Sequence, residues 1–198
     1  MANGVEWSLF EGGVNYNSTV LIQGPGQQGL SQTVICKQAG ASLIIVTGTS
    51  KDAARLEVAK KLGADHVINY RTDRFEHETR KITKKKGVDV VFEHVGADTF
   101  NGSLLSMKRG GRLVTCGGHS GEVVPLDIIP LFRMQWQIIG SFTYTKGEYE
   151  AVMQMVADGR LKPGMYARVD LVVDRKAAVL AIPAEAVRLA REAIARRK

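Results

Sequence analysis

Three glycines, Gly24, Gly26 and Gly29, carry the clearest chemical meaning, because they stand in the spacing Gly-x-Gly-x-x-Gly. They follow a β-branched and aliphatic run, Thr19 to Gln23, and precede a segment that can form a helix. Gly24 permits a tight turn out of a strand, Gly26 lets backbone approach a phosphate, and Gly29 allows close packing of helix on strand. The start of that helix offers free N–H groups and the positive end of its dipole, so this stretch predicts a site for a dinucleotide pyrophosphate.

Cysteine and histidine are the other residue types that could do chemistry. Cys36 and Cys116 lie far apart in apolar surroundings, which favours two buried free thiols over a disulfide or a metal site. The sequence has no Cys-x-x-Cys and no His-x-x-x-His, so it gives no sign of a zinc site of its own. His94 follows an apolar run and is open to two interpretations, a proton carrier or a wall of the site. His119, on a glycine-rich loop, is expected to be exposed.

Apolar runs and helical patterns alternate along the chain, which predicts an α/β protein with a doubly wound, parallel, six-stranded sheet. The run from Leu43 to Val46 is continuous and apolar, as in a parallel strand covered on both faces. The predicted strands are 19–23, 43–46, 66–70, 88–95, 112–116 and 136–142, and the predicted helices are 5–10, 29–39, 51–62, 75–85, 99–107, 126–132 and 148–158. Ligands of such sheets bind at the carboxyl ends of the strands. The loops that matter are therefore 24–29, 47–51, 70, 94–96, 116–118 and 141–143.

Composition and charge narrow the function classes. Of the 198 residues, 44% are hydrophobic and 24% are charged, as in a globular protein. No apolar run approaches the roughly 20 residues that span a bilayer, and the first residues lack the pattern of a signal peptide. We therefore expect a cytoplasmic protein without a membrane partner. The net charge of +7 is concentrated in residues 71–86 and 184–198, where aromatic residues are almost absent, which argues against nucleic-acid binding.

Four blocks of sequence resemble the medium-chain dehydrogenase/reductase superfamily, in the order in which that superfamily has them. They are Val20–Gly29, Leu62–Tyr70, Gly87–Gly96 and Gly110–Val114. The likeness covers roughly residues 5–163 and is greatest to zinc-type alcohol dehydrogenases and to quinone oxidoreductases. It implies that residues 1–163 form a Rossmann-type dinucleotide-binding domain, and that the reaction is hydride transfer to or from a nicotinamide.

The resemblance also implies which residues hold the cofactor. The pyrophosphate loop is Gly24, Pro25, Gly26, Gln27, Gln28 and Gly29. Members that prefer NAD carry an acidic residue where the second strand meets the adenosine ribose, whereas here no carboxylate precedes Asp52. Small donors and cations suit a 2′-phosphate, so NADP is the expected cofactor and NAD the second choice. The residues expected at this end are Thr47, Gly48, Thr49, Lys51, Arg55 and Tyr70. For Lys51 and Arg55 the alternative is plain helix surface, and for Tyr70 it is an aromatic packed at a strand end.

The remaining strand ends are expected to line the nicotinamide, where backbone carbonyls can bond its carboxamide. These residues are His94, Val95, Gly96, Cys116, Gly117, Gly118, Ser141, Phe142 and Thr143. The resemblance favours His94 as a wall residue, because proton relays of the superfamily mostly come from elsewhere. The sequence assigns no catalytic residue and no metal ligand.

The chain departs from the superfamily at both ends. Full-length members carry a catalytic domain before this region, so the sequence indicates an isolated cofactor domain: an excised domain, a fragment, or one piece of a larger enzyme. Residues 164–198 form a tail of uncertain origin, either a family tail with an insertion or a junction with unrelated sequence, since Leu161 to Val187 resembles efflux adaptor proteins. We expect this tail to form a short β-hairpin, with strands at 166–173 and 177–182, and a helix from Pro183 onward.

Three functions remain open. The first is an oxidoreductase domain that handles alcohols, aldehydes, quinones or enones once a substrate domain is supplied. The second is a nucleotide-binding module without catalysis of its own, and the third is an excised enoyl reductase domain of a polyketide or fatty-acid synthase. The strand expected at residues 137–142 is apolar and lacks charge or proline, so it also predicts a homodimer through this edge.

Overall fold

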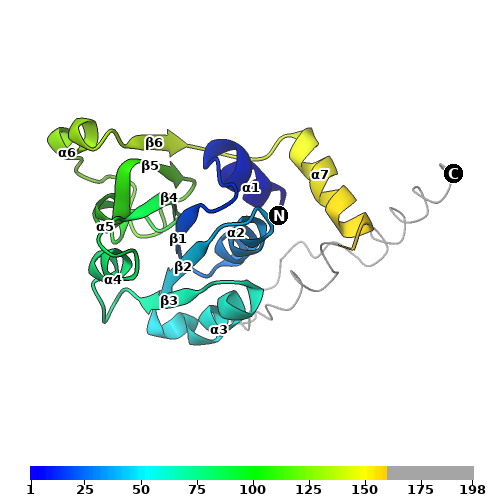
Figure 1. Cartoon of the computed structure of the whole chain (residues 1–198), viewed down its shortest axis with the longest axis horizontal. Helices are drawn as coiled ribbons and strands as arrows, with labels where there is room; N and C mark the ends of the chain where they lie inside the picture. The colour runs from blue at the N-terminus through cyan, green and yellow to red at the C-terminus, as the bar shows by residue number, and fades with distance from the viewer. Residues whose placement is uncertain (160–198) are drawn as a thin grey trace, which may run out of the picture.

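The computed structural model describes residues 1–159, and these form a single sheet with helices on both faces (Figure 1). The strands are β1 Thr19–Gln23, β2 Leu43–Gly48, β3 His66–Asn69, β4 Val88–Glu93, β5 Met107–Thr115 and β6 Gln137–Gly140. The helices are α1 Ala2–Val5, α2 Gln27–Gln38, α3 Ala53–Leu62, α4 Phe75–Ile82, α5 Phe100–Ser106, α6 Ile128–Arg133 and α7 Lys146–Ala157, with a π-helical turn η1 Glu6–Glu11 and a 3₁₀ turn η2 Ser50–Asp52.

The sheet has the strand order β3-β2-β1-β4-β5-β6, and every neighbouring pair is parallel. The chain winds outward from β1 to β3, crosses back, and winds outward again from β4 to β6. The direction of winding therefore reverses between β1 and β4, which is where a crevice opens at the carboxyl edge of such a sheet. The predicted doubly wound, six-stranded parallel sheet is confirmed.

Alternate side chains of the central strands bury themselves on opposite faces, as the pleat of a strand requires. Val20 and Ile22 pack with α2 and α3 in one core, whereas Leu21 packs with α4 and α5 in the other. Ile44, Ile45 and Val46 are completely buried, in agreement with the continuous apolar run. Covering both faces of this apolar sheet is the main source of the fold's stability.

Several element boundaries differ from the prediction by a few residues. The helix predicted at residues 5–10 begins earlier, as α1, and continues as the π-helical turn η1. There the Gly12 amide donates to the Trp7 carbonyl, five residues back, at 2.9 Å. β5 begins at Met107 rather than Arg112, because the strand continues through a bulge: Val88 pairs with Met107, and Val90 already pairs with Arg112. Gly110 takes a positive φ of 73° in this bulge.

The edge strand β6 is shorter than predicted, ending at Gly140 instead of residue 142. The Ser141 amide still bonds the Thr115 carbonyl at 3.0 Å, but the chain then turns away toward α7. It is held there by the Asn3 side chain, which accepts a hydrogen bond from the Tyr144 amide at 3.0 Å. The domain boundary predicted at residue 163 and the predicted hairpin and helix of the tail lie outside the described residues.

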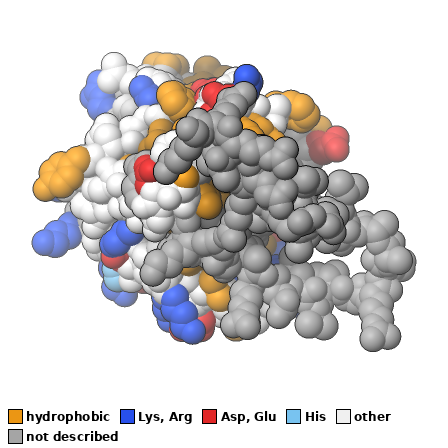
Figure 2. Space-filling model, turned by 90° about the vertical axis from the view of Figure 1, so that its right-hand side faces the viewer, with side chains coloured by type: hydrophobic (Ala, Val, Ile, Leu, Met, Phe, Trp, Pro, Cys, Tyr) orange, Lys and Arg blue, Asp and Glu red, His pale blue; other side chains and the backbone are white. Residues whose placement is uncertain are grey.

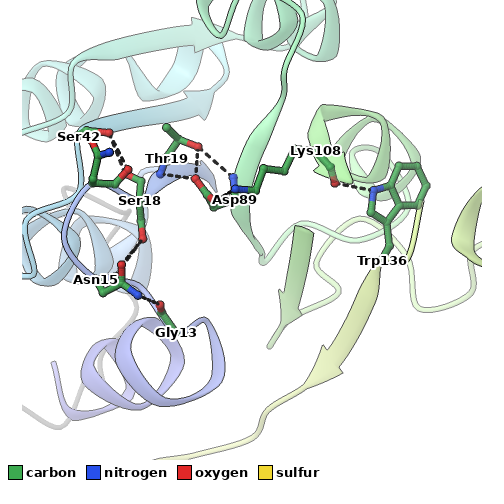
Figure 3. A network of polar contacts seen from close by, with 9 residues as sticks. Gly13, Asn15, Ser18, Thr19, Ser42, Asp89, Lys108 and Trp136 are labelled. Atoms are coloured by element: carbon green, nitrogen blue, oxygen red, sulfur yellow. Dashed lines mark hydrogen bonds and ion pairs between the residues drawn. The ribbon is translucent and has the colours of Figure 1, made fainter. Parts of the chain in front are cut away.

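The amino ends of the strands are joined by a polar network, shown in Figure 3. Asp89 accepts hydrogen bonds from the Thr19 amide at 2.9 Å and the Thr19 hydroxyl at 2.6 Å, and it pairs with Lys108. Burial acts to raise the pKa of Asp89, but the bonds from Lys108 and Thr19 outweigh it and hold the pKa below its usual value. The indole of Trp136 donates to the Lys108 carbonyl at 3.1 Å. This end of the sheet is thus built for stability, opposite the end where a ligand would bind.

Two further observations bear on possible partners, one on helix length and one on the distribution of surface charge. Within residues 1–159, no helix combines the length and apolarity that crossing a bilayer requires. On the face seen in Figure 2, the visible lysine and arginine side chains are spread around the margin and do not gather into one patch.

Candidate functional site

The glycine loop lies between β1 and α2, at the carboxyl edge of the sheet. Gly24 has a φ of 88°, a conformation that favours glycine, and its amide bonds the Thr47 carbonyl of β2 at 3.1 Å. A side chain on Gly29 would overlap the Gly24 carbonyl oxygen, so the helix can pack this closely only with glycine there. A side chain on Gly26, in contrast, would meet no atom within 4 Å. Gly24 therefore forms the tight turn and Gly29 the close helix contact that their spacing predicts, and Gly26 faces open space.

The first turn of α2 begins directly after Gly26, and no side chain caps it. The first N–H groups of a helix have no partner within the helix, and they carry the positive end of its dipole. An uncapped helix of 12 residues behind an open glycine is a favourable site for an anion such as a pyrophosphate.

The end of β2 meets the glycine loop through Gly48. Gly48 is closely surrounded by Pro25 of the loop, Leu56 of α3 and Asp52 of η2. A Cβ atom at Gly48 would lie within 3.3 Å of an atom of each of these three residues. The Gly48 carbonyl accepts a hydrogen bond from the Tyr70 amide at 3.0 Å. Thr47, Gly48 and Tyr70 are therefore neighbours at one corner of the site.

Asp52 is the first carboxylate after β2, and its oxygens are already engaged. One oxygen accepts from the amide and the hydroxyl of Thr49, at 3.0 and 2.7 Å, and the other accepts from Arg55 at 3.1 Å. Tyr70 is half-buried, and the Arg71 guanidinium stacks over its ring at 5.2 Å. Burial raises the pKa of the Tyr70 hydroxyl, so it is a neutral donor.

Glu93, the last residue of β4, is completely buried at the point where the winding reverses. One of its carboxyl oxygens accepts from the amides of Val95 and Gly96, at 2.8 and 3.0 Å, and from the Thr99 hydroxyl at 2.8 Å. The other accepts from the Ser103 hydroxyl at 2.6 Å. Four donors converge on one buried carboxyl group, which fixes the backbone of residues 94–96 to α5.

The same network continues beneath the glycine loop. Gln23, at the end of β1, donates to the Ser103 hydroxyl at 2.9 Å and accepts from the Thr47 hydroxyl of β2. Gln23, Thr47 and Ser103 are completely buried. We call the set Thr47, Gln23, Ser103, Glu93 and Thr99 the switch-point network. It connects the carboxyl ends of β1, β2 and β4, at the point where the winding of the sheet reverses.

His94 lies between α2 and β5. Its Nε2 is 2.6 Å from the Gln32 carboxamide oxygen and its Nδ1 is 3.1 Å from the Cys116 sulfur. Since that oxygen can only accept, Nε2 carries the proton and Nδ1 accepts from the thiol. The ring of Trp7 packs against the imidazole at 5.8 Å between centroids. His94 is therefore held in one tautomer and one orientation.

The glycine-rich loop after β5 lies across the residues that follow β4. The Ser120 amide and hydroxyl both donate to the Val95 carbonyl, at 2.7 and 2.9 Å. A side chain on Gly96 would come within 2.5 Å of the Gly121 carbonyl oxygen, and one on Gly117 within 2.7 Å of the His94 carbonyl oxygen. The two predicted loops 94–96 and 116–118 are therefore in direct contact.

Comparison with known proteins identifies this arrangement. Residues 29–158 match the family described as zinc-binding dehydrogenase. The chain belongs to that family. The sorbitol dehydrogenase of Bacillus subtilis (strain 168) is 36% identical over 143 residues, and the D-arabitol-phosphate dehydrogenase of Enterococcus avium is 33% identical over 144 residues. Each match covers 72% of this chain and about two fifths of the relative, 40% and 41% respectively.

Solved structures agree with the fold. A crystal structure of an NAD-dependent alcohol dehydrogenase superposes with a TM-score of 0.74 at 31% identity, over 82% of this chain and 47% of that protein. The chain thus corresponds to the nucleotide-binding part of the medium-chain dehydrogenase/reductase superfamily, and the superfamily resemblance seen in the sequence is confirmed.

The family description names zinc, which raises the question whether the side chains of this chain could bind the metal. Residues 1–159 contain no group of three or more His, Cys, Asp or Glu side chains placed to hold a metal ion. Cys116 and His94 do meet, but burial and the nearby charge of Glu93 raise the pKa of the Cys116 thiol to about 12, far from the thiolate that binds zinc. The side chains of residues 1–159 therefore do not fit a zinc site.

The structure places the sequence-predicted residues at one edge of the sheet, at the carboxyl ends of β1 to β6 and in the segments that follow them. Lys51 is exposed on η2, and Phe142, which follows β6, is 92% exposed. Neither side chain is packed against the rest of residues 1–159. Sequence reasoning named Thr47 but missed Gln32 and the other four members of the switch-point network, Gln23, Glu93, Thr99 and Ser103. A signal for Glu93 did exist, because a carboxylate at the end of a strand buried on both faces requires donors nearby.

The packing of His94 predicts a pH dependence of stability. Burial, and then the charge of His119, lower the pKa of His94 to about 4 from 6.5. Because the unfolded chain binds this proton more readily, stability is complete above about pH 6.5 and is lost as the pH falls toward 4. We expect about 2 kcal/mol to be lost between pH 7 and pH 5 from this group.

Urea unfolding at both pH values measures this loss, and the His94→Gln variant should be less sensitive to acid by about that amount. The exposed His77 on α4 supplies the matched control, His77→Gln, which should behave as the native chain does. Equal acid sensitivity of the native chain and His94→Gln would contradict the assignment.

Proposed function

We propose that this chain binds NADP(H) and presents the nicotinamide for hydride transfer, with an alcohol, aldehyde, quinone or enone as the partner. The observation that carries the proposal is the glycine loop: an open Gly26 and an uncapped α2 at the carboxyl edge, where the winding of the sheet reverses. Sorbitol and alcohol dehydrogenases among the relatives support the reaction type.

The residues divide along the length of the cofactor. Gly24 to Gly29 would hold the pyrophosphate with backbone amides, and the corner of Thr47, Gly48, Thr49 and Tyr70 would hold the adenosine ribose. The contacting loops 94–96 and 116–118, with residues 141–143, would line the nicotinamide. When bound, the nicotinamide supplies the hydride. The protein's part is to orient the ring and exclude water, and no described residue is assigned as catalytic.

The preference for NADP over NAD is supported by the end of β2. A 2′-phosphate needs donors and positive charge, and a free carboxylate there would repel it. Asp52 is not free, since Thr49 and Arg55 occupy both of its oxygens. Arg55 and Lys51 supply cations, and Thr49 and Ser50 supply hydroxyl groups.

We extend the proposal to assembly and location. β6 is an edge of the sheet, and the α6 helix before it exposes Ile128, Ile129 and Phe132, which supports pairing with a second copy. Cys36 and Cys116 are free thiols, which suits the reducing cytoplasm. The chain spans about two fifths of the length of the matched relatives, 40% to 41%, so catalytic turnover by this chain is itself part of the proposal.

A titration of NADPH fluorescence tests the proposal, with NADH in parallel and ADP-ribose as a competitor. We expect saturable binding, tighter for NADPH, that ADP-ribose reverses. Adding a quinone and an alcohol to the same chain then distinguishes an oxidoreductase from a binding module without catalysis. No binding of either nucleotide at millimolar concentration would contradict the proposed function.

A second candidate, enoyl reduction, is favoured by one comparison. The crotonyl-CoA reductase of Streptomyces collinus is 29% identical over 163 residues and is covered to 36% of its length. The same chain incubated with NADPH and an enoyl thioester would give consumption of NADPH if this candidate is correct.

A further inference from the structure

The outer edge of β3 is not paired with any other strand of residues 1–159. β3 stands first in the strand order of the sheet, and its inner side pairs with β2. The N–H and C=O groups on the outer side of such a strand have no partners in the sheet, so they can pair with a further extended segment. This edge is therefore able to accept a seventh strand.

A cavity lies on each face of this edge. The α4-side cavity, of about 500 Å³, is lined by His66, Val67, Ile68, Asp73, Glu78 and Lys81. The α3-side cavity, of about 400 Å³, is lined by Val67, Asn69, Ala53, Ala54 and Leu56. Because successive side chains of a strand point to opposite faces, a strand added outside β3 would direct its side chains alternately into the two cavities.

The described part of the chain ends on the same side of the molecule. Although α7 follows β6 at the opposite edge, Val152 of α7 packs in one cluster with residues of α2, and Leu62 at the end of α3 packs against that cluster. Leu62 is four residues before β3, a separation of at most about 14 Å. The seven residues from Gly159 to Tyr166 span up to about 25 Å when extended, so a segment that starts at Tyr166 can reach the amino end of β3.

The sequence of residues 166–173, which lie outside the described residues, suits both cavities. A strand was predicted there, and it would have alternate side chains on its two sides. One side is entirely apolar: Ala167, Val169, Leu171 and Val173. The other side carries two opposite charges, with Tyr166, Arg168, Asp170 and Val172. The apolar side matches the alanines and leucine of the α3-side cavity, and the charged side matches the carboxylates and the lysine of the α4-side cavity.

We propose that residues 166–173 of this same chain pair with the outer edge of β3 as a seventh strand. Because the segment enters at the amino end of β3, it runs parallel to that strand. Its apolar side chains fill the α3-side cavity, and Arg168 meets the carboxylates of Asp73 and Glu78 in the α4-side cavity. The added strand closes an edge that would otherwise be open to pairing with other chains.

Hydrogen–deuterium exchange of the full chain, followed by NMR for each amide, tests the added strand. We expect slow exchange in residues 166–173 and at those amides of residues 66–69 that face away from β2, because pairing protects both strands. The double variant Val169→Lys and Leu171→Lys places two charges in the α3-side cavity, so exchange in both segments should become at least about tenfold faster. The matched control, Val187→Lys with Leu189→Lys, makes the same two changes elsewhere in residues 160–198 and should leave both segments slow. The amides of β1 should keep their rates in every variant, which shows that the rest of the sheet stays folded.

Three results would overturn the inference. The first is fast exchange at the outward-facing amides of residues 66–69 in the native chain, as in an edge strand without a partner. The second is an equal increase of exchange in both double variants, since the effect would then not be specific to residues 166–173. The third is protection that is lost on dilution of the protein, which would assign the added strand to a second copy. None of these rates depends on nucleotide binding, so the test is independent of the proposed function.

Discussion

Replacing Glu93 with alanine will lower the free energy of unfolding by about 4 kcal/mol or more, the largest loss that we expect from a single polar side chain in this protein. The substitution removes the acceptor for the amides of Val95 and Gly96 and the hydroxyls of Thr99 and Ser103. Each buried donor left without a partner costs about 1–3 kcal/mol. Urea unfolding of the two proteins measures the difference.

Glu93→Gln separates the hydrogen bonds from the charge. Its amide keeps one oxygen for three of the donors, and its NH₂ group can donate to Ser103, so we expect a loss of about 1–2 kcal/mol. The exposed Glu57→Ala should change stability by no more than about 0.5 kcal/mol. If Glu93→Ala proves as mild as Glu57→Ala, the switch-point network does not hold the carboxyl ends of these strands together.

The second large effect is on binding, and it comes from Gly26. A methyl group there meets no protein atom within 4 Å and the φ of −70° suits any residue, so Gly26→Ala should change stability by no more than about 1 kcal/mol. It would, however, occupy the space through which phosphates approach the backbone. We expect the dissociation constant of NADPH to rise at least about 30-fold, which is about 2 kcal/mol.

Gly29→Ala provides the contrast within the same loop. Its methyl group would overlap the Gly24 carbonyl oxygen, so the backbone must shift, and we expect about 1–3 kcal/mol of lost stability together with lost binding. Fluorescence titration and urea unfolding of both variants separate the two roles. Native affinity in Gly26→Ala would show that no phosphate lies on that glycine.

Much of this fold is predictable, because few arrangements of helices can cover both faces of an apolar sheet. A run such as Leu43–Val46 must be buried on both faces, and alternation with helices then gives parallel strands. The glycine loop is predictable for a related reason: a tight turn and a close helix contact each exclude side chains. The ends of strands are harder to predict where single contacts set them, as the bulge at Gly110 and the early end of β6 show.

The switch-point network could not be predicted from local sequence. Gln23 and Ser103 are 80 residues apart, and nothing in the pattern of either segment specifies the other. The same holds for His94 and Gln32, 62 residues apart, which meet only because β4 lies beside β1 and its helix. Polar partners across a core depend on register, which hydrophobic patterning fixes only after the strand order is known.

The central claim is that backbone amides at the start of α2 hold the diphosphate of a nicotinamide dinucleotide. A titration of the ¹⁵N-labelled chain with NADP⁺, followed by amide chemical shifts, tests it most directly. We predict that the largest shifts fall on residues 26–29, with smaller ones on Gly48, Thr49, Val95 and Gly96. Unmoved amides at residues 26–29, with shifts instead around Thr19 and Asp89 at the amino end of the sheet, would contradict it.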